Sequence, residues 1–228
     1  MGKTLIIKLI FVAFFVSGFS GAVGGDLCGR GLKGQASAQS LSENPQVGTA
    51  DEQGGFGKRL SDAAIALTRD RVVYDPAYFR IPYPGGDVPS DRGVCTDIVI
   101  RAYRRLGIDL QKEVHEDMKA NFDKYPKTWG LSRPDTNIDH RRVPNLMTFF
   151  GRHGAKLPAT RDAADYALGD IVCWQLPGGQ IHIGIVVSRL NRAGTHRMIV
   201  HNIGGGQVVE DCLFEFRIIG HYRYDGAQ

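Results

Sequence analysis

Four polar residues of the chain could carry out nucleophilic chemistry together. Cys95 lies in VCTDIVIRAYRRLG, where a loop gives way to an expected helix. His182 and His201 lie in two β-rich stretches, HIGIVV and MIVHNI, and Asn202 follows the second. A cysteine attacks only as its thiolate, which a helix N-terminus or a nearby imidazole favours. A thiol, a base and a polar group that orients the base form the catalytic set of a cysteine hydrolase.

Helices are expected in the first half of the folded domain, and one of them positions Cys95. Apolar residues at three- and four-residue spacing predict a first helix from about residue 58 and a second from Cys95. The second helix should end just before Gly107, because glycine is favourable immediately after a helix. Two more are expected from Asp109 and from near Pro144. Between the first two, proline and glycine in residues 74–93 predict an ordered loop that leads to the cysteine.

Short strands are expected after residue 165, and two of them position the histidines. The stretches GDIVCWQL, IHIGIVVSRL, HRMIVHNI and LFEFRIIGHYRY are separated by glycine- and asparagine-containing turns. A hairpin through RLNRAGTH would make His182 and His201 neighbours, and Gly184 leaves room beside them. Helices followed by antiparallel strands predict an α+β domain in which the N-terminal helices pack on a C-terminal sheet.

The N-terminus has the features of an export signal. Residues 1–22 combine two lysines, an apolar run and small residues, and cleavage is expected near Ala22, with Ala38 as a second site. The apolar run is shorter than the roughly 20 residues of a spanning helix, although an uncleaved anchor is an alternative. Residues 23–57 are expected to be a flexible spacer, and residues 58–228 the domain. We expect an exported protein of the periplasm or cell envelope, with no integral membrane domain after signal removal.

Composition and motifs exclude several other functions. The 228 residues carry a formal charge of +4 without a run of five like charges, so no nucleic-acid partner is expected. The glycines at 204–206 lack the helix and lysine of a phosphate loop. Cys95, His182 and His201 could bind zinc, but they lack the short ligand pairs of zinc sites. We therefore expect neither a metal nor another cofactor.

The motifs resemble those of known families. YPGGDVPSDRGVCTDIVIRAYRRLGIDL resembles the cysteine helix of the NlpC/P60 cell-wall peptidases, and HIGIVV with IVHN resembles their histidine strand and third polar residue. Residues 58–224 resemble the bacterial family called domain of unknown function 1287, through VCTDIVIRAYR, NIDHRRVPNL, GDIVCW, HIGIVVS, IVHNIGGG and GHYRY. The resemblance implies a papain-like fold in which Cys95 is the nucleophile, His182 the base and His201 the orienting residue.

Two further residues near the cysteine, Asp97 and Tyr83, have expected accessory roles. Thr96 and Asp97 stand where the peptidases carry Ser-Gly, which leaves the substrate open. Asp97 could hold the site together or only stabilise the positive end of the helix. Tyr83 matches the peptidases' loop tyrosine and could donate a hydrogen bond to a reacting oxyanion.

Other polar residues have two interpretations each. Asn202 competes with His201 for the orienting role. Arg141 and Arg142 could clamp a substrate carboxylate, or they could form structural ion pairs. His140, which precedes them, is a further candidate.

The remaining cysteines and one histidine have mainly structural interpretations. Cys173 and Cys212 could form a disulfide in an exported protein, or they could be buried free thiols. Cys28 falls in the spacer, and His221 in GHYRY is expected to satisfy a contact of the fold.

These patterns together predict an exported cysteine hydrolase of amide or peptide bonds that acts on peptidoglycan peptides through a thioester. The backbone N–H of Cys95 should contribute to the oxyanion hole, and its thiol should have a lowered pKa. One alternative is a silent cell-wall binding module. Another is a thiol acyltransferase or lipid hydrolase, whose groove should be apolar, whereas the loops PYPGGDVPSDRG and RPDTNIDHRR are polar.

Overall fold

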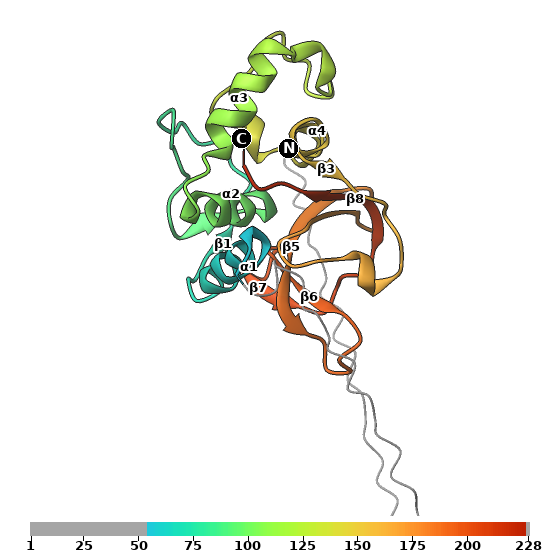
Figure 1. Ribbon diagram of the computed structural model, residues 1–228. Helices are drawn as coiled ribbons and strands as arrows, with labels where there is room; N and C mark the ends of the chain where they lie inside the picture. Colours follow the sequence, from blue (N-terminus) through green and yellow to red (C-terminus); the bar gives the residue numbers. More distant parts are fainter. Residues whose placement is uncertain (1–53, 227–228) are drawn as a thin grey trace, which may run out of the picture. The chain divides into compact units, whose positions relative to one another are not determined.

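The computed structural model describes residues 54–226, in which helices come first and a sheet follows (Figure 1). The helices are α1 (Phe56–Leu67), α2 (Cys95–Arg105), α3 (Leu110–Ala120) and α4 (Val143–His153), with short 3-10 turns η1 (Phe122–Lys124), η2 (Asp139–Arg141) and η3 (Ala163–Asp165). The expected α+β class is confirmed. The predicted signal and nearly all of the predicted spacer, with Cys28, lie outside the described residues, and α1 begins two residues before the expected start of the domain.

The sequence around Cys95 explains why α2 begins there. Val94 has extended backbone angles, and its N–H donates to the Oδ2 atom of Asp97 at 2.6 Å. An acid three residues into a helix commonly satisfies the backbone in this way and also offsets the positive end of the helix dipole. Gly107 follows the helix with a φ of 84°, a conformation that favours glycine. The expected second helix is confirmed at both ends.

Helices α3 and α4 also begin at residues with a local reason. Asp109 caps α3, because its side chain accepts a hydrogen bond from the N–H of Gln111. Pro144 lies in the first turn of α4, where its missing N–H costs nothing, and α4 ends before Gly154. Both helices agree with the sequence expectation.

The sheet has six strands in the order β3-β8-β4-β5-β6-β7. All neighbours are antiparallel. The strands are β3 (Ala155–Lys156), β4 (Ile171–Gln175), β5 (Ile181–Leu190), β6 (Arg197–His201), β7 (Val208–Glu210) and β8 (Arg217–Arg223). No helix among the described residues is long and apolar enough to cross a membrane.

The hairpin of β5 and β6 brings the two histidines together, as predicted. Ile185 pairs with Val200, so the antiparallel register places Gly184 opposite His201. A side chain at Gly184 would put its Cβ 2.6 Å from a methyl of Ile199 and 3.2 Å from the Cβ of His201. Glycine at this position therefore lets the two strands approach beside the histidines.

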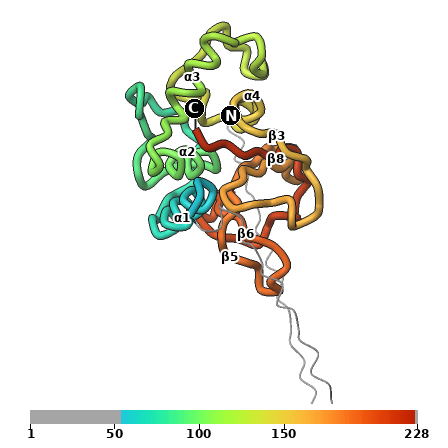
Figure 2. Tube along the Cα trace, viewed as in Figure 1, coloured from blue at the N-terminus to red at the C-terminus, as the bar shows by residue number. Residues whose placement is uncertain are grey.

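Helices α1, α2 and α4 pack on one face of the sheet, and the main core lies between them and the sheet. Helix α3 packs on α2 and α4. Helices α1 and α2 lie against β5 (Figures 1 and 2). Ile98 and Tyr103 of α2 are fully buried there with Ile183 and Ile185 of β5. Burying one such aliphatic side chain contributes about 1.5–3 kcal/mol. A smaller cluster around Trp174 covers the other face. The start of α2 is thus fixed against the strand that carries His182.

The loop before α2 is ordered through two short strands, β1 (Val73–Tyr74) and β2 (Arg92–Gly93), which pair in parallel. Tyr74 is the register partner of Gly93. The pairing places Tyr74 beside Gly93, which is two residues before Cys95. Tyr74 therefore lies near Cys95 although the two are 21 positions apart in the chain.

Candidate functional site

Cys95 is the first residue of α2 and is 6% exposed. It contributes to a cleft with a volume of about 370 Å³. Most of the side chains that line this cleft with Cys95 are apolar, and Arg141, Arg142 and Gln180 are the polar exceptions. The others are Tyr74, Pro76, Val94, Trp129, Ile138, Val143, Pro144 and Ile181. The candidate nucleophile therefore borders a cavity large enough for part of a substrate.

The thiol of Cys95 is held in its neutral form. Burial raises the pKa of Cys95 to about 12, and the nearby carboxylate of Asp97 acts in the same direction. Hydrogen bonds from backbone N–H groups, Ile183 foremost, act in the opposite direction and offset only part of this rise. The expectation of a lowered pKa is wrong. The thiolate loses more stabilisation when burial removes its hydration than it gains from the N-terminus of α2.

His182 lies on β5 directly before Ile183, whose backbone N–H favours the thiolate of Cys95. Its Nε2 atom is 2.8 Å from the Nδ1 atom of His201. Burial, with a smaller effect of His201, lowers the pKa of His182 to about 3. Within residues 54–226, no protein group hydrogen bonds to the other ring nitrogen, Nδ1. His182 is thus a neutral imidazole with one nitrogen left for an incoming group.

A carboxylate that the sequence analysis missed completes this chain of contacts. The Nε2 atom of His201 is 2.7 Å from Oε2 of Glu210, at the end of β7. Burial lowers the pKa of His201, and Glu210 opposes that effect. The turn GGGQ between β6 and β7 was a usable signal, since a hairpin there places Glu210 diagonally across from His201 on the same face of the sheet.

The hydrogen-bond chain assigns the ring protons. A carboxylate only accepts hydrogen bonds, so Nε2 of His201 donates to Glu210. Nδ1 of His201 then carries a lone pair and accepts from Nε2–H of His182. This leaves the lone pair of His182 on Nδ1. A neutral histidine with a free lone pair can accept a proton there, which is what a general base requires.

Asn202 is fully buried beside this chain but serves another contact. Its Nδ2 atom donates to the carbonyl of Gly93 at 3.3 Å, and its Oδ1 atom accepts from the N–H of Gly204 at 3.2 Å. Asn202 therefore ties the turn after β6 to the strand before Cys95. The hydrogen-bond partner of His182 is therefore His201 and not Asn202.

Asp97 and Arg141 form a buried ion pair under the start of α2. Nε and Nη2 of Arg141 lie 2.8 and 3.0 Å from the two carboxylate oxygens, with the side chains of Arg141 and Asp97 2% and 3% exposed. Thr96 adds a hydrogen bond to the carbonyl of Arg141 at 3.1 Å. Arg141 already holds a carboxylate of its own protein, so the structural interpretation applies to it.

Arg142 lies beside the cleft in a more open setting. Its guanidinium is 3.1 Å from the Oδ1 atom of Asp139 and 4.2 Å from the centroid of the Trp129 ring. Arg142 and Trp129 both line the cleft of Cys95. Of the two arginines, only Arg142 combines this position with a partly exposed side chain.

The tyrosine near Cys95 is Tyr74 rather than Tyr83. Burial raises the pKa of Tyr74, and its proximity to Cys95 and Asp97 acts in the same direction. Tyr74 also lines the cleft. The ring of Tyr83 instead packs against His115 of α3, with centroids 4.9 Å apart. The structure does not bring Tyr83 into the site. The pairing of β1 with β2 places Tyr74, an earlier tyrosine of the loop, near Cys95 instead.

The outcomes for the remaining candidates follow from their burial and their partners. Cys173 and Cys212 are buried free thiols, so they do not form the alternative disulfide. Burial lowers the pKa of His140 to about 3, so it is neutral. His221 bonds to Asp170 at 2.8 Å, which agrees with its expected role in the fold.

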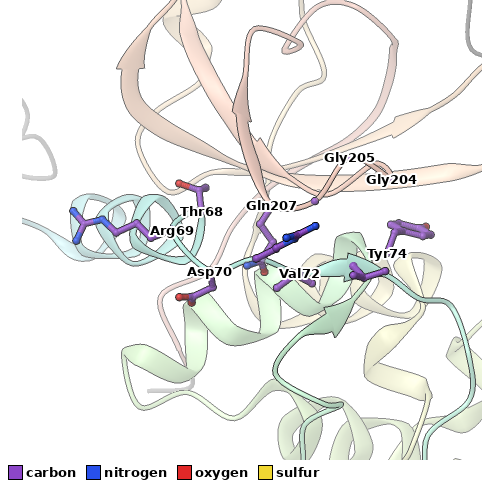
Figure 3. A pocket seen from close by; sticks show the side chains of 11 residues that line it. Thr68, Arg69, Asp70, Val72, Tyr74, Gly204, Gly205 and Gln207 are labelled. Carbon is purple, nitrogen blue, oxygen red and sulfur yellow. The ribbon is translucent and has the colours of Figure 1, made fainter.

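A second depression also has Tyr74 among its lining residues (Figure 3). It has a volume of about 480 Å³ and is formed by residues 68–74 and 204–207. None of the expected catalytic residues lines it. The glycines at 204–206 form one wall of it as a turn, in agreement with the sequence analysis.

Comparison with known proteins places this site in a family. The chain matches the family model DUF1287, a domain of unknown function, over residues 61–224. It belongs to this family, as its motifs predicted. The uncharacterized protein YijF of Escherichia coli strain K12 is 53% identical over 165 residues, which are 72% of this chain and 80% of YijF.

One solved structure is also similar. NlpC1 from Trichomonas vaginalis has a TM-score of 0.42 and 16% sequence identity, over 78% of this chain and 46% of that chain. The chain therefore spans less than half of NlpC1.

Proposed function

We propose that this domain is a cysteine hydrolase that cleaves amide or peptide bonds through a thioester. The observation that carries the proposal is the hydrogen-bond chain from Glu210 through His201 to His182. It leaves the lone pair of His182 on Nδ1, and His182 directly precedes Ile183, whose backbone N–H favours the thiolate of Cys95. A base with its proton acceptor set by partners, beside a thiol at a cleft, is the arrangement that nucleophilic catalysis requires.

The proposed reaction has two steps with balanced proton transfers. Nδ1 of His182 takes the thiol proton of Cys95 as sulfur attacks the carbonyl carbon of the substrate. The same proton passes to the leaving nitrogen as the C–N bond breaks, which yields an amine and a thioester on Cys95. His182 then takes a proton from water, the hydroxide attacks the thioester, and the proton returns to sulfur as the acid leaves.

The resting site begins this reaction from neutral partners. The pKa of Cys95 is raised and that of His182 is lowered, both mainly by burial. A thiol and an imidazole in such surroundings do not exchange a proton spontaneously. Proton transfer is therefore coupled to the approach of the substrate carbonyl, whose developing charge lies at the positive end of α2.

Charge on the substrate oxygen needs hydrogen-bond donors. The backbone N–H of Cys95 lies in the first turn of α2, where N–H groups lack partners within the helix. Tyr74, at the edge of the same cleft, is the side chain that we propose as a second donor. Removing one such donor typically costs about 10²–10³-fold in turnover.

We propose peptidoglycan peptides as the substrate class and the periplasm or cell envelope as the place of action. The signal-like residues 1–22 and the resemblance to the NlpC/P60 cell-wall peptidases support both. A silent binding module has no use for an ordered Glu210–His201–His182 chain, so the hydrolase is the better interpretation.

A thiol acyltransferase or lipid hydrolase is the second candidate, and one observation favours it. The polar loops argue for a polar groove, yet most side chains that line the cleft are apolar, with Trp129 and Ile181 among them. An acyl chain would fit such walls.

The test compares the purified chain with its Cys95→Ser variant on two substrates. Muropeptides and a long-chain acyl ester are incubated separately, and products and protein adducts are read by mass spectrometry. We expect muropeptide cleavage by the wild type and a loss of about 10³-fold or more in the variant, with an unchanged circular dichroism spectrum. Cleavage that survives in Cys95→Ser would refute the thiol mechanism, and turnover of the ester alone would select the second candidate.

A further inference from the structure

A cluster of metal-ligand side chains lies at the far end of the hydrogen-bond chain from Cys95. It consists of His201 at the end of β6, Glu210 at the end of β7 and Cys212 in the following turn. Their ligand atoms all lie within 4.8 Å of one another, and within residues 54–226 this is the one such group. An imidazole, a carboxylate and a thiolate are the three ligand types that zinc prefers in proteins.

The spacing of the three ligand atoms suits a tetrahedral ion. The Sγ atom of Cys212 is 3.8 Å from Nε2 of His201. A tetrahedral zinc with ordinary bond lengths sets nitrogen and sulfur ligands about 3.6 Å apart, and nitrogen and oxygen about 3.4 Å apart. The Glu210 oxygen, now 2.7 Å from Nε2, must move by about 0.7 Å. Its side chain is 50% exposed and therefore has room to do so.

We propose that His201, Glu210 and Cys212 form a zinc site, and that zinc bound there blocks the hydrolase from a distance. The three side chains leave a fourth position for water, on the solvent side where Glu210 is exposed. The His201 ring lies between this site and His182, so it is the connection between them. The binding part of this proposal stands alone, whereas the inhibition part rests on the proposed function.

Zinc would act by reversing the protons of the hydrogen-bond chain. Zinc binds through the lone pair of Nε2 of His201, so this nitrogen can no longer carry the proton that it donates to Glu210. The proton of the neutral ring must then lie on Nδ1 of His201. That Nδ1–H then donates to Nε2 of His182, whose own proton moves to its Nδ1. No proton is lost from either ring, and one is released from Cys212 as it becomes the thiolate ligand. The nitrogen that should accept the thiol proton is then already protonated.

Binding is tested first, without activity as a readout. The full chain with Cys28→Ala and Cys95→Ala is freed of metal, then titrated with Zn²⁺ by calorimetry and with Co²⁺ by absorption, which reports cobalt–thiolate bonds. We expect one ion per chain with a thiolate charge-transfer band. Adding Cys212→Ser should remove the band and weaken binding at least 10-fold. Adding Cys173→Ala, a buried free thiol outside the cluster, should leave both unchanged.

Each outcome of the binding test decides the proposal. Absence of binding in the doubly substituted chain, or a thiolate band that persists in Cys212→Ser, overturns the site. Circular dichroism and thermal melting of Cys212→Ser and Cys212→Ala exclude misfolding as the cause of lost binding. Glu210→Gln is the second test variant and should weaken Zn²⁺ binding without removing the cobalt–thiolate band.

Inhibition is tested separately in the chain that retains Cys95. We expect Zn²⁺ to inhibit hydrolysis, and Cys212→Ser to raise the concentration for half-inhibition at least 10-fold. Equal inhibition of both proteins would mean that zinc acts directly on Cys95 and His182, which overturns the inhibition part. A chain without hydrolase activity would refute the proposed function, whereas the calorimetric and cobalt results would still decide the metal site.

Discussion

Two buried histidine–carboxylate arrangements in this domain differ in how they end. His221 bonds through Nε2 to Asp170 at 2.8 Å and through Nδ1 to the carbonyl of Pro158 at 3.0 Å. Asp170 is itself held by Arg223 at 2.7 and 3.0 Å and is fully buried. Both ring nitrogens of His221 are therefore occupied by protein groups. The other arrangement runs from Glu210 through His201 to His182 and ends at Nδ1 of His182, to which no group of the described residues hydrogen bonds.

The difference separates a structural histidine from a candidate catalytic one. Burial and a carboxylate partner are common to both arrangements, so neither property marks a site. The useful property is a ring nitrogen to which no group of residues 54–226 hydrogen bonds, on the residue that precedes Ile183, whose backbone N–H favours the thiolate of Cys95. We call the arrangement of His221, Asp170 and Arg223 the closed arrangement, and that of Glu210, His201 and His182 the open arrangement. The closed arrangement fixes β8 against β4. The open arrangement sets which ring nitrogen of His182 carries the proton.

The largest expected effect is a difference in turnover per folded molecule between variants of the two arrangements. His182→Ala should lower this turnover by roughly 10²–10⁴-fold, because general acid–base catalysis contributes that much, and it should also lower stability, because a buried hydrogen-bonded ring is removed. His221→Gln should lower the free energy of unfolding by about 1–3 kcal/mol, because a hydrogen-bonded buried group is disturbed, yet turnover per folded molecule should remain. Denaturant unfolding and steady-state rates measure the two quantities.

The comparison breaks if the two variants behave alike. A His221→Gln protein that is stable but inactive would place catalysis at the closed arrangement. A His182→Ala protein that retains wild-type turnover would remove the general base from the proposed mechanism.

A second prediction concerns the thiol and the pH. The pKa of Cys95 is raised to about 12, so the thiol remains neutral from pH 6 to 9. Its alkylation by iodoacetamide should be roughly 10²-fold slower than that of an unfolded cysteine with a pKa of about 8.5, and should keep rising with pH up to 9. Peptide mapping follows Cys95 separately from Cys28, Cys173 and Cys212.

The contrary result is a fast reaction at pH 6.5 that changes little with pH. Such a profile would mean that Cys95 and His182 form a thiolate–imidazolium pair in the free protein. The open arrangement would then be charged at rest, and the coupling of proton transfer to substrate approach would be unnecessary.

Much of the fold and part of the site were predictable because their signals are local. Apolar periodicity and Gly107 define α2, so the place of Cys95 at a helix start follows from a short stretch of sequence. The hairpin of β5 and β6 follows from two β-branched stretches and a turn, and it makes His182 and His201 neighbours. Each feature depends on residues fewer than about 20 positions apart.

The missed features depend on contacts between distant segments. Arg141 lies 44 positions from Asp97, and only the packing of η2 against α2 shows that it holds this carboxylate. Tyr74 replaces Tyr83 because β1 pairs with β2. The pKa of Cys95 depends on how completely the fold excludes water, which a helix-end argument does not contain.

A third prediction ranks the members of the open arrangement. His201→Ala should lower turnover by roughly 10–10²-fold, less than His182→Ala, because His201 orients the base and does not exchange a proton with the substrate. Rates of the two variants on one substrate decide the order. Equal losses, or a larger loss in His201→Ala, would mean that the roles of the two histidines are misassigned.

The smallest expected effect is that of Glu210→Gln, which alters the far end of the same arrangement. Glutamine keeps the volume but can present either a donor or an acceptor to Nε2 of His201. When it donates, the protons of His201 and His182 reverse and the base loses its lone pair at Nδ1. We expect turnover to fall roughly 10-fold, mainly in kcat, because only part of the molecules then carry the active proton arrangement.

Two observations separate this positioning role of Glu210 from a merely structural one. Glu210→Asp keeps an acceptor-only carboxylate on a shorter side chain, so it should recover more activity than Glu210→Gln. Since Glu210 is half exposed, neither variant should change the thermal melting temperature appreciably. If Gln and Asp lose activity equally while the melting temperature falls, Glu210 supports the β6–β7 hairpin and does not set the protons of His182.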